Sequence, residues 1–184
     1  MIDARRETPS SLRTDMLVVL FLIGLDVAAR LLPHTPNFMP LTASALFAGV
    51  IVSRRSLALA VPLVAMLVSD IALGFDDWRI ALLDYAALTL PVAVGIYGRR
   101  FRLSRMLVPA ALSCSLLFFA VSNFAVWVFG GLYSPDMAGL VKCYVLALPF
   151  LQYTVAGDLI WIMVLFGAAT LVQRLANRSN AVTA

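Results

Sequence analysis

Long apolar stretches dominate this sequence, and they restrict what the chain can fold into more than any other feature. Hydrophobic residues make up 62% of the chain and charged residues 13%, whereas soluble domains average about 45–50% and about 25%. A chain of 184 residues has room for roughly six helices of the length that crosses a bilayer. The sequence therefore predicts an all-α integral membrane protein rather than a soluble domain.

Turn signals and arginines divide the apolar sequence into predicted spans. These spans cover approximately residues 16–32, 40–52, 57–73, 78–97, 106–129 and 150–172. The prediction is thus a cytoplasmic polar tail at residues 1–15, a single six-helix membrane domain at residues 16–173, and a second cytoplasmic polar tail at residues 174–184.

The segment before the last predicted span has a helix-start signal of its own. Residues 134–172 are too long for one crossing at about 1.5 Å per residue. Ser134, Pro135 and Asp136 supply a capping serine, a proline at the first position and an acid in the first turn. Pro149 is expected to interrupt the helix. We therefore expect a short outer surface helix, at about residues 135–148, before the last span.

Basic residues are distributed unequally between the two ends of the predicted spans. Three of the fourteen, Arg30, Arg79 and Lys142, lie at one end, and the remaining eleven lie at the end of the termini. Because cytoplasmic loops carry the excess of Lys and Arg, both termini are predicted to be cytoplasmic (N-in/C-in). The basic clusters act as topology signals in this interpretation, so we expect no nucleic-acid partner.

Polar side chains inside the predicted spans concentrate in their outer halves. A carboxylate in the hydrocarbon region is costly unless it is paired or hydrated, so this asymmetry predicts an outward-facing polar pocket for a small solute. Asp26 and Arg30, four residues apart on one helix, are expected to pair with each other. The predicted ligand-binding residues are His34, Asn37, Asp70, Asp84, Tyr85, Asn123, Trp127, Gln152, Asp158 and Trp161.

Several of these residues also have a structural interpretation. Asp70 and Asp84 are equally consistent with carboxylates at helix ends or at the membrane interface, and Asn123 with hydrogen bonding between helices. Trp127 suits the aromatic belt of a membrane interface. Asp158 is the strongest pocket candidate, because no Lys or Arg in its own span can reach it.

Motifs of enzymes and metal sites are absent from the sequence. It contains no P-loop, no G-x-S-x-G and no H-E-x-x-H, and we predict no enzymatic activity and no cofactor. Cys114 and Cys143 belong to different predicted helices, which supports neither a disulfide framework nor a metal site.

Three runs of sequence carry a resemblance to known membrane proteins. They are RLLPHTPNFMPLTASALFAG, LALAVPLVAMLVSDIALGF and SNFAVWVFGGLYSPDMAGLVKCYVLALPFLQYTVAGDLIW. Through them residues 25–170 resemble an uncharacterised family of small bacterial six-span membrane proteins described as transport proteins. In size, topology and outward site, the chain also resembles the S-components of energy-coupling-factor vitamin transporters, the BtuM-like cobalamin type in particular. The resemblance implies a multi-pass protein of the bacterial cytoplasmic (inner) membrane that takes up a vitamin-like solute.

The resemblance also bears on the ligand. In the BtuM-like proteins a cysteine in the outer part of the protein ligates cobalt. Cys143 is the outer cysteine of this sequence, so the resemblance makes it the candidate ligand to a metal-containing solute. The solute stays open between cobalamin and another compound.

Two classes of function are consistent with these features. In the first, the protein binds a small solute under a roof formed by residues 34–40 and 135–148, and its partners are that solute and the lipid bilayer. In the second, it is a structural or assembly subunit that packs against a membrane partner subunit or a second copy of itself. The small-residue pairs Gly24/Ala28 and Ala45/Gly49 suit such helix packing.

Overall fold

The computed structural model describes residues 11–33, 35–75, 77–99 and 103–182, and these ranges contain six helices and no strand. The all-α prediction is confirmed. Four of the described helices, α3 to α6, are long and apolar enough to cross a membrane. The helices are α1 (Leu12–Leu31), α2 (Leu41–Ile51), α3 (Arg55–Leu73), α4 (Trp78–Gly98), α5 (Leu103–Phe129) and α6 (Met137–Val182).

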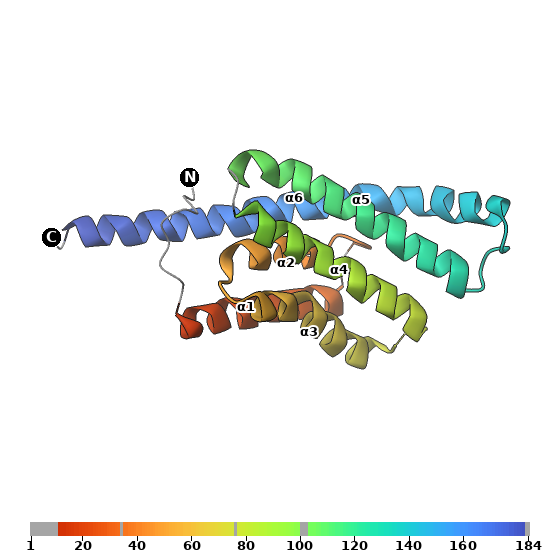
Figure 1. Ribbon diagram of the computed structural model, residues 1–184, viewed down its shortest axis with the longest axis horizontal. Coiled ribbons are helices and arrows are strands. Elements are labelled where there is room, and N and C mark those ends of the chain that lie inside the picture. Colours follow the sequence, from red (N-terminus) through yellow and green to blue (C-terminus); the bar gives the residue numbers. More distant parts are fainter. Residues whose placement is uncertain (1–10, 34, 76, 100–102, 183–184) are drawn as a thin grey trace.

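Successive helices run in opposite directions, which gives the bundle two distinct ends (Figure 1). We call one the loop end, where the connections at residues 32–40, 74–77 and 130–136 lie. The opposite end holds the start of α1 and the end of α6, and we call it the arginine end. Its described basic residues include Arg54, Arg55, Arg99, Arg174 and Arg178.

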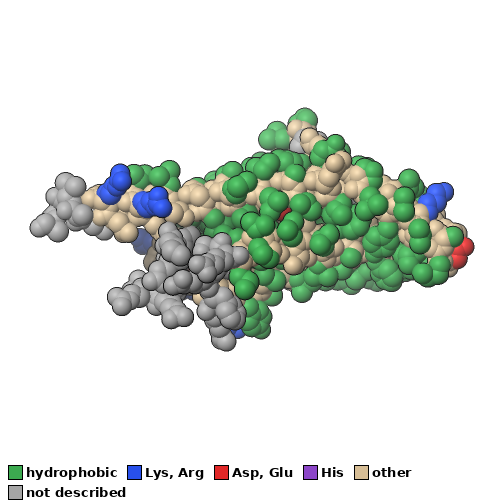
Figure 2. Space-filling model, turned by 90° about the horizontal axis from the view of Figure 1, so that it is seen from above, with side chains coloured by type: hydrophobic (Ala, Val, Ile, Leu, Met, Phe, Trp, Pro, Cys, Tyr) green, Lys and Arg blue, Asp and Glu red, His purple; other side chains and the backbone are tan. Residues whose placement is uncertain are grey.

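The outer surface of the bundle is apolar along most of its length. Figure 2 shows hydrophobic side chains over most of the visible face, with Lys and Arg near the two ends. Large side chains such as Phe21, Ile71 and Met163 are mostly exposed. A surface of this kind is compatible with a transmembrane protein, because lipid tails can cover it.

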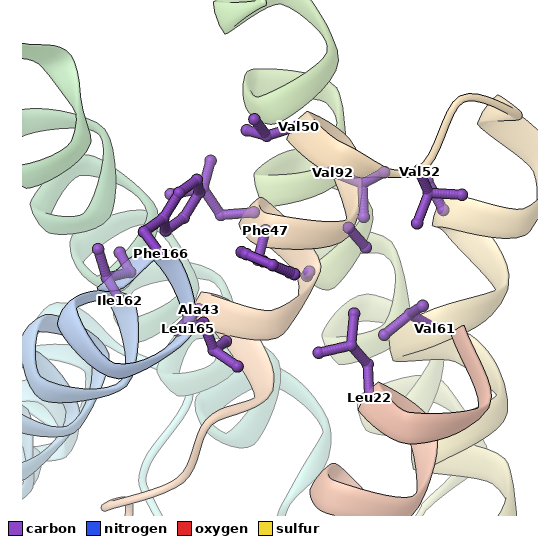
Figure 3. Close-up of a cluster of buried hydrophobic side chains, with 14 of the residues drawn as sticks. Leu22, Ala43, Phe47, Val50, Val52, Val61, Val92, Ile162, Leu165 and Phe166 are labelled. Carbon is purple, nitrogen blue, oxygen red and sulfur yellow. The ribbon is translucent and has the colours of Figure 1, made fainter. Parts of the chain in front are cut away.

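Helix α2 lies at the centre of the bundle, and every residue from Leu41 to Val50 is buried. Figure 3 shows side chains of α1, α3, α4 and α6 around it, among them Leu22, Val92 and Phe166. Its 11 residues extend only about 16 Å, roughly half of a hydrocarbon core of about 30 Å. The helix predicted at residues 40–52 therefore exists, but it is too short to cross a membrane by itself.

Two glycines let α2 and α4 touch along their backbones. A Cβ added to Gly49 would lie 2.3 Å from the carbonyl oxygen of Val92, and one on Gly95 would lie 2.4 Å from that of Leu46. Small residues permit such close approach of helices in membranes. The Ala45/Gly49 pair, which suited contact with a partner helix, thus packs within the chain at Gly49.

Arginines fix the carboxyl end of α2. Arg99 donates hydrogen bonds from Nε to the carbonyl oxygen of Gly49 at 2.8 Å and from Nη2 to that of Val52. Carbonyls in the last turn of a helix have no partner within the helix, and a guanidinium satisfies them well. Close by, Arg54 forms an ion pair with the buried Asp15 at 3.2 Å. The carboxyl end of α2 is therefore held in place at the arginine end.

The expected short surface helix is wrong, because α6 is one helix of 46 residues that includes Pro149. A proline removes one backbone hydrogen bond, a loss that neighbouring helices can compensate in a membrane. Packing against α5 supports this part of α6: the Tyr144 hydroxyl donates to the carbonyl oxygen of Ala120 at 2.6 Å. The helix also continues to Val182, into the segment predicted as a polar tail.

The start of α6 also differs in detail from the prediction. The Gly139 N–H donates to Asp136 Oδ1 at 2.7 Å, so the capping side chain is Asp136 rather than Ser134. This hydrogen bond and one from the Ser134 hydroxyl hold the pKa of Asp136 below its usual range. The helix begins two residues later than expected, at Met137 rather than Pro135, because an aspartate caps as well as a serine.

Candidate functional site

A cavity of about 300 Å³ lies in the loop-end half of the bundle. This volume is at the lower end of small-molecule pockets, which span about 300–1,000 Å³. Its wall draws on all six described helices and on the segment before α2. The lining residues are Arg30, Asn37, Met39, Leu41, Thr42, Met66, Asp70, Ala81, Asp84, Leu88, Phe118, Phe119, Ser122, Asn123, Ala147, Phe150, Thr154 and Asp158.

A tight turn brings Asn37 to the wall. The Phe38 N–H donates to the carbonyl oxygen of Thr35 at 3.0 Å, and Asn37 has a φ of 63°. Proline followed by a residue with positive φ is the pattern of a type II turn, and asparagine tolerates that conformation better than most residues. The turn rests on α6, where a Cβ on Gly157 would lie 3.2 Å from Phe38 Cα.

An ion pair between helices lies at the cavity wall. Arg30 Nη2 of α1 is 2.5 Å from Asp70 Oδ1 of α3, and these side chains are 17% and 12% exposed. The Tyr85 hydroxyl of α4 donates to the other oxygen of Asp70 at 2.6 Å. The expected pairing of Arg30 with Asp26 is therefore wrong. Asp70 is the better partner, because Tyr85 satisfies its second oxygen while Arg30 takes the first.

Asp26 takes no part in this ion pair, and its side chain is only 1% exposed. Its Oδ2 accepts a hydrogen bond of 2.5 Å from the Ser44 hydroxyl of α2, and its Oδ1 has no hydrogen-bond partner among the described residues. The Ser44 hydroxyl of α2, rather than Arg30 as expected, is thus the hydrogen-bond partner of Asp26. Asp26 is absent from the cavity wall.

Asp158 joins three helices at the wall of the cavity. It is 2% exposed, and its Oδ2 accepts a hydrogen bond of 2.5 Å from the Ser115 hydroxyl of α5. Thr42, in the first turn of α2, is its second hydrogen-bonding neighbour. Both described partners are neutral hydroxyls, so they orient the carboxylate without cancelling its charge.

Half of the residues predicted from the sequence line the cavity. The lining includes Asn37, Asp70, Asp84, Asn123 and Asp158, which come from five different segments. Asn123 also donates to the carbonyl oxygen of Phe119, one turn earlier in α5, at 2.8 Å. The structure therefore brings these separate polar residues around one space.

Four other predicted residues lie away from the lining. Tyr85 acts through Asp70, and the Trp127 indole donates to the carbonyl oxygen of Ser134 at 3.0 Å, beside the loop end. Gln152 is exposed on the outside of α6. Trp161 packs against the apolar core around α2. The prediction at His34 lies outside the described residues.

Cys143 lies in the contact between α5 and α6. It is 1% exposed, and its thiol points to the carbonyl oxygen of Asn123 at 3.4 Å. It does not line the cavity. Over the described part of the chain, no three His, Cys, Asp or Glu side chains come close enough together to hold a metal ion.

Sequence reasoning overlooked the hydroxyl and aromatic side of the cavity. Ser115 and Thr42 hold Asp158, and Phe118, Phe119 and Ser122 complete the wall on α5. A signal for α5 was present, because positions 115, 118, 119, 122 and 123 recur at helical spacing on one face. Thr42 gave no such signal, since it belongs to a helix with nearly uniform burial.

Comparison with known proteins gives one match. A model described as "Family of unknown function (DUF6580)" matches residues 10–180. No curated protein and no solved structure matches the chain.

Proposed function

The chain belongs to the DUF6580 family, whose function is unknown, and we propose that it binds a small polar solute in the loop-end cavity and helps to move it across a bacterial inner membrane. The observation that carries this proposal is the cavity of about 300 Å³, with walls from six helices and three carboxylates. Carboxylates at membrane depth are costly, and they are typically retained where water or a ligand meets them.

The cavity faces the outside of the cell in this proposal. In the predicted topology eleven of the fourteen Lys and Arg residues fall at the end of the termini, whereas Arg30, Arg79 and Lys142 fall at the other end. By the positive-inside rule the arginine end is cytoplasmic. A solute therefore enters from outside, at the loop end.

The half-length α2 supports a transport role over simple binding. Many transporters place their sites where a discontinuous helix ends inside the membrane. Here the first turn of α2 contributes Leu41 and Thr42 to the cavity, while Arg99 holds the other end of the helix. The likeness to these transporters is one of helix arrangement alone, and the resemblance to S-components implies the same role.

The volume of the cavity limits the size of the solute. About 300 Å³ equals the share of roughly ten water molecules in liquid water. This volume favours a small molecule over a corrinoid as the proposed solute. The proposed solute is a small molecule of about ten non-hydrogen atoms, if each takes about the volume of one water.

Mass spectrometry of small molecules retained through mild purification tests the proposal. Ala147 lines the cavity, whereas Ala156 on the same helix is exposed on the outside. We expect the wild-type protein and Ala156→Phe to retain the same compound, and Ala147→Phe to lose it because the new ring fills the cavity. Equal retention by both variants would place the compound elsewhere and contradict the proposal.

A subunit role in a larger complex is the second candidate, and one observation favours it. Nothing lies within 4 Å of a Cβ built on Gly24, and Leu20 and Phe21 beside it are more than half exposed. This face of α1 is open to a second helix as well as to lipid. A protein partner that co-purifies stoichiometrically and is lost in Gly24→Phe would favour the subunit role.

A further inference from the structure

We propose that the solute is a compact organic cation, an amine with an apolar body, whose ammonium group is held at Asp158. This inference rests on the proposed function, since it names the class of solute for the same cavity. It is argued from the charge of the wall, the partners of Asp158 and the aromatic side of the cavity.

The charge of the wall is negative. Its described ionisable residues are three aspartates and one arginine. Arg30 is committed to Asp70 through the ion pair of 2.5 Å, and Tyr85 donates to the same carboxylate. The guanidinium is therefore poorly placed to bind an anionic solute, because it would have to leave Asp70.

Asp158 offers a site for a positive charge. Its described partners are the hydroxyls of Ser115 and Thr42, and none of the ion pairs among the described residues includes it. An ammonium group both cancels a buried carboxylate charge and donates hydrogen bonds to it, and such charge-assisted hydrogen bonds are about twice as strong as neutral ones. The hydroxyls of Ser115 and Thr42 keep the carboxylate oriented when no solute is bound.

The partial positive charge at the amino end of α2 favours an anionic solute. Its size therefore has to be compared with the negative charge of the cavity wall. A helix start carries roughly +0.5 of an elementary charge and attracts anions, and Leu41 and Thr42 bring that end to the cavity. Three carboxylates against one guanidinium outweigh this partial charge. We therefore assign the dipole of α2 to stabilising Asp158, next to Thr42, rather than to binding an anionic solute.

The rest of the wall suits the apolar body of such a solute. Phe118, Phe119 and Phe150 line the cavity together with Met66 and Leu88. Aromatic faces attract cations as well as apolar groups. A wall with one carboxylate end and several aromatic rings recognises an amine better than it recognises a sugar or a carboxylic acid.

Three probes of nearly equal size and different charge test the inference: 2-phenylethylamine, 2-phenylethanol and phenylacetate. Each is added to the purified full-length protein, and the thermal unfolding midpoint is followed against probe concentration. We expect the amine to raise the midpoint at the lowest concentration. In Asp158→Asn the apparent affinity for the amine should fall by about tenfold or more, with little change for the alcohol.

Asp136→Asn is the matched control. It removes a carboxylate at the exposed start of α6, and asparagine caps a helix as well as aspartate. This variant should bind the amine like the wild type.

Two results would overturn the inference while leaving the proposed function standing. The alcohol or phenylacetate could bind at least as tightly as the amine, with the effect lost in Ala147→Phe, or amine binding could survive in Asp158→Asn. Absence of a response to all three probes also overturns the inference. Mass spectrometry of the small molecules retained by the wild type, Ala147→Phe and Ala156→Phe then tests the proposed function separately.

Discussion

At the scale of single residues, hydroxyl groups hold two of the buried carboxylates of this bundle, Asp26 and Asp158. Ser44 holds Asp26, and Ser115 with Thr42 holds Asp158. A hydroxyl satisfies a carboxylate oxygen without removing its charge, so such a group stays available for a proton or a cation. Asp70 differs from both, because Arg30 already neutralises it.

Gly49 provides a residue-scale prediction about stability. A Cβ there would lie 2.3 Å from the carbonyl oxygen of Val92, so Gly49→Ala must push α2 away from α4. We expect Gly49→Ala to lower the free energy of unfolding by about 1–3 kcal/mol, measured by thermal or denaturant unfolding in detergent.

Gly24→Ala is the control for this prediction. Nothing lies near its added methyl group, and alanine favours a helix over glycine by about 0.5–1 kcal/mol. Its stability should be unchanged or slightly higher. A similar loss of stability in both variants would contradict direct backbone contact between α2 and α4.

Among the site residues, charge in an apolar span was the property that the sequence revealed best. Asp70, Asp84 and Asp158 stand out in such spans, and all three line the cavity. Trp161 was included because it shares a helix stripe with Asp158, and Gln152 because it lies near the outer end of the predicted span. The packing of α6 turns both side chains elsewhere. A one-residue error in the facing of a helix rotates a side chain by about 100°, which is enough to move it off the wall.

At the scale of elements, the chain combines one very short and one very long helix. The 11 residues of α2 are buried at the centre, and the 46 residues of α6 run past the bundle (Figure 1). Prolines at positions 33, 36 and 40 kept the segment before α2 from becoming a helix, as expected from their missing N–H groups. Pro149 does not end α6, because the residues before the proline pack against α5 through the hydrogen bond from Tyr144 to the carbonyl oxygen of Ala120.

The continuity of α6 gives a prediction for distance measurements. Val141 and Leu171 are both more than half exposed and lie on either side of Pro149. Spin labels on cysteines at these positions, with Cys114 and Cys143 replaced by alanine, should be about 45 Å apart in a continuous helix. A right-angle break at Pro149 would instead give about 35 Å.

A label pair at Tyr153 and Leu171 is the control for this experiment. Both positions lie after Pro149, so about 27 Å is expected whether or not the helix is broken. The shorter distance for the first pair, with the control pair unchanged, would restore the separate surface helix.

Helix boundaries were easier to predict than helix roles. The predicted spans at residues 57–73, 78–97 and 106–129 agree with α3, α4 and α5 to within a few residues, because turn residues and arginines mark their ends. The sequence could not separate α2 from a full span. Both are apolar throughout, and only tertiary packing makes α2 a central half-helix.

At the scale of the whole molecule, the proposed uptake of a solute requires a polar cavity that opens to the outside. The cavity belongs to the loop end, where Thr154 is a half-buried wall residue on α6. Most of the described arginines belong to the opposite end, among them Arg54, Arg55, Arg99, Arg174 and Arg178. If the loop end faces outward, a water-soluble reagent should reach Thr154 from outside the cell but should not reach the lipid-facing Met163 on the same helix.

Cysteine labelling in intact cells tests this claim most directly, in a protein with Cys114 and Cys143 replaced by alanine. A small, membrane-impermeant, cationic thiol reagent should label Ser134→Cys and Thr154→Cys. It should leave Met163→Cys unlabelled, and Ser179→Cys should react only after the cells are opened. Labelling of Thr154→Cys only in opened cells, or its failure to react while Ser134→Cys reacts, would contradict an outward-facing cavity.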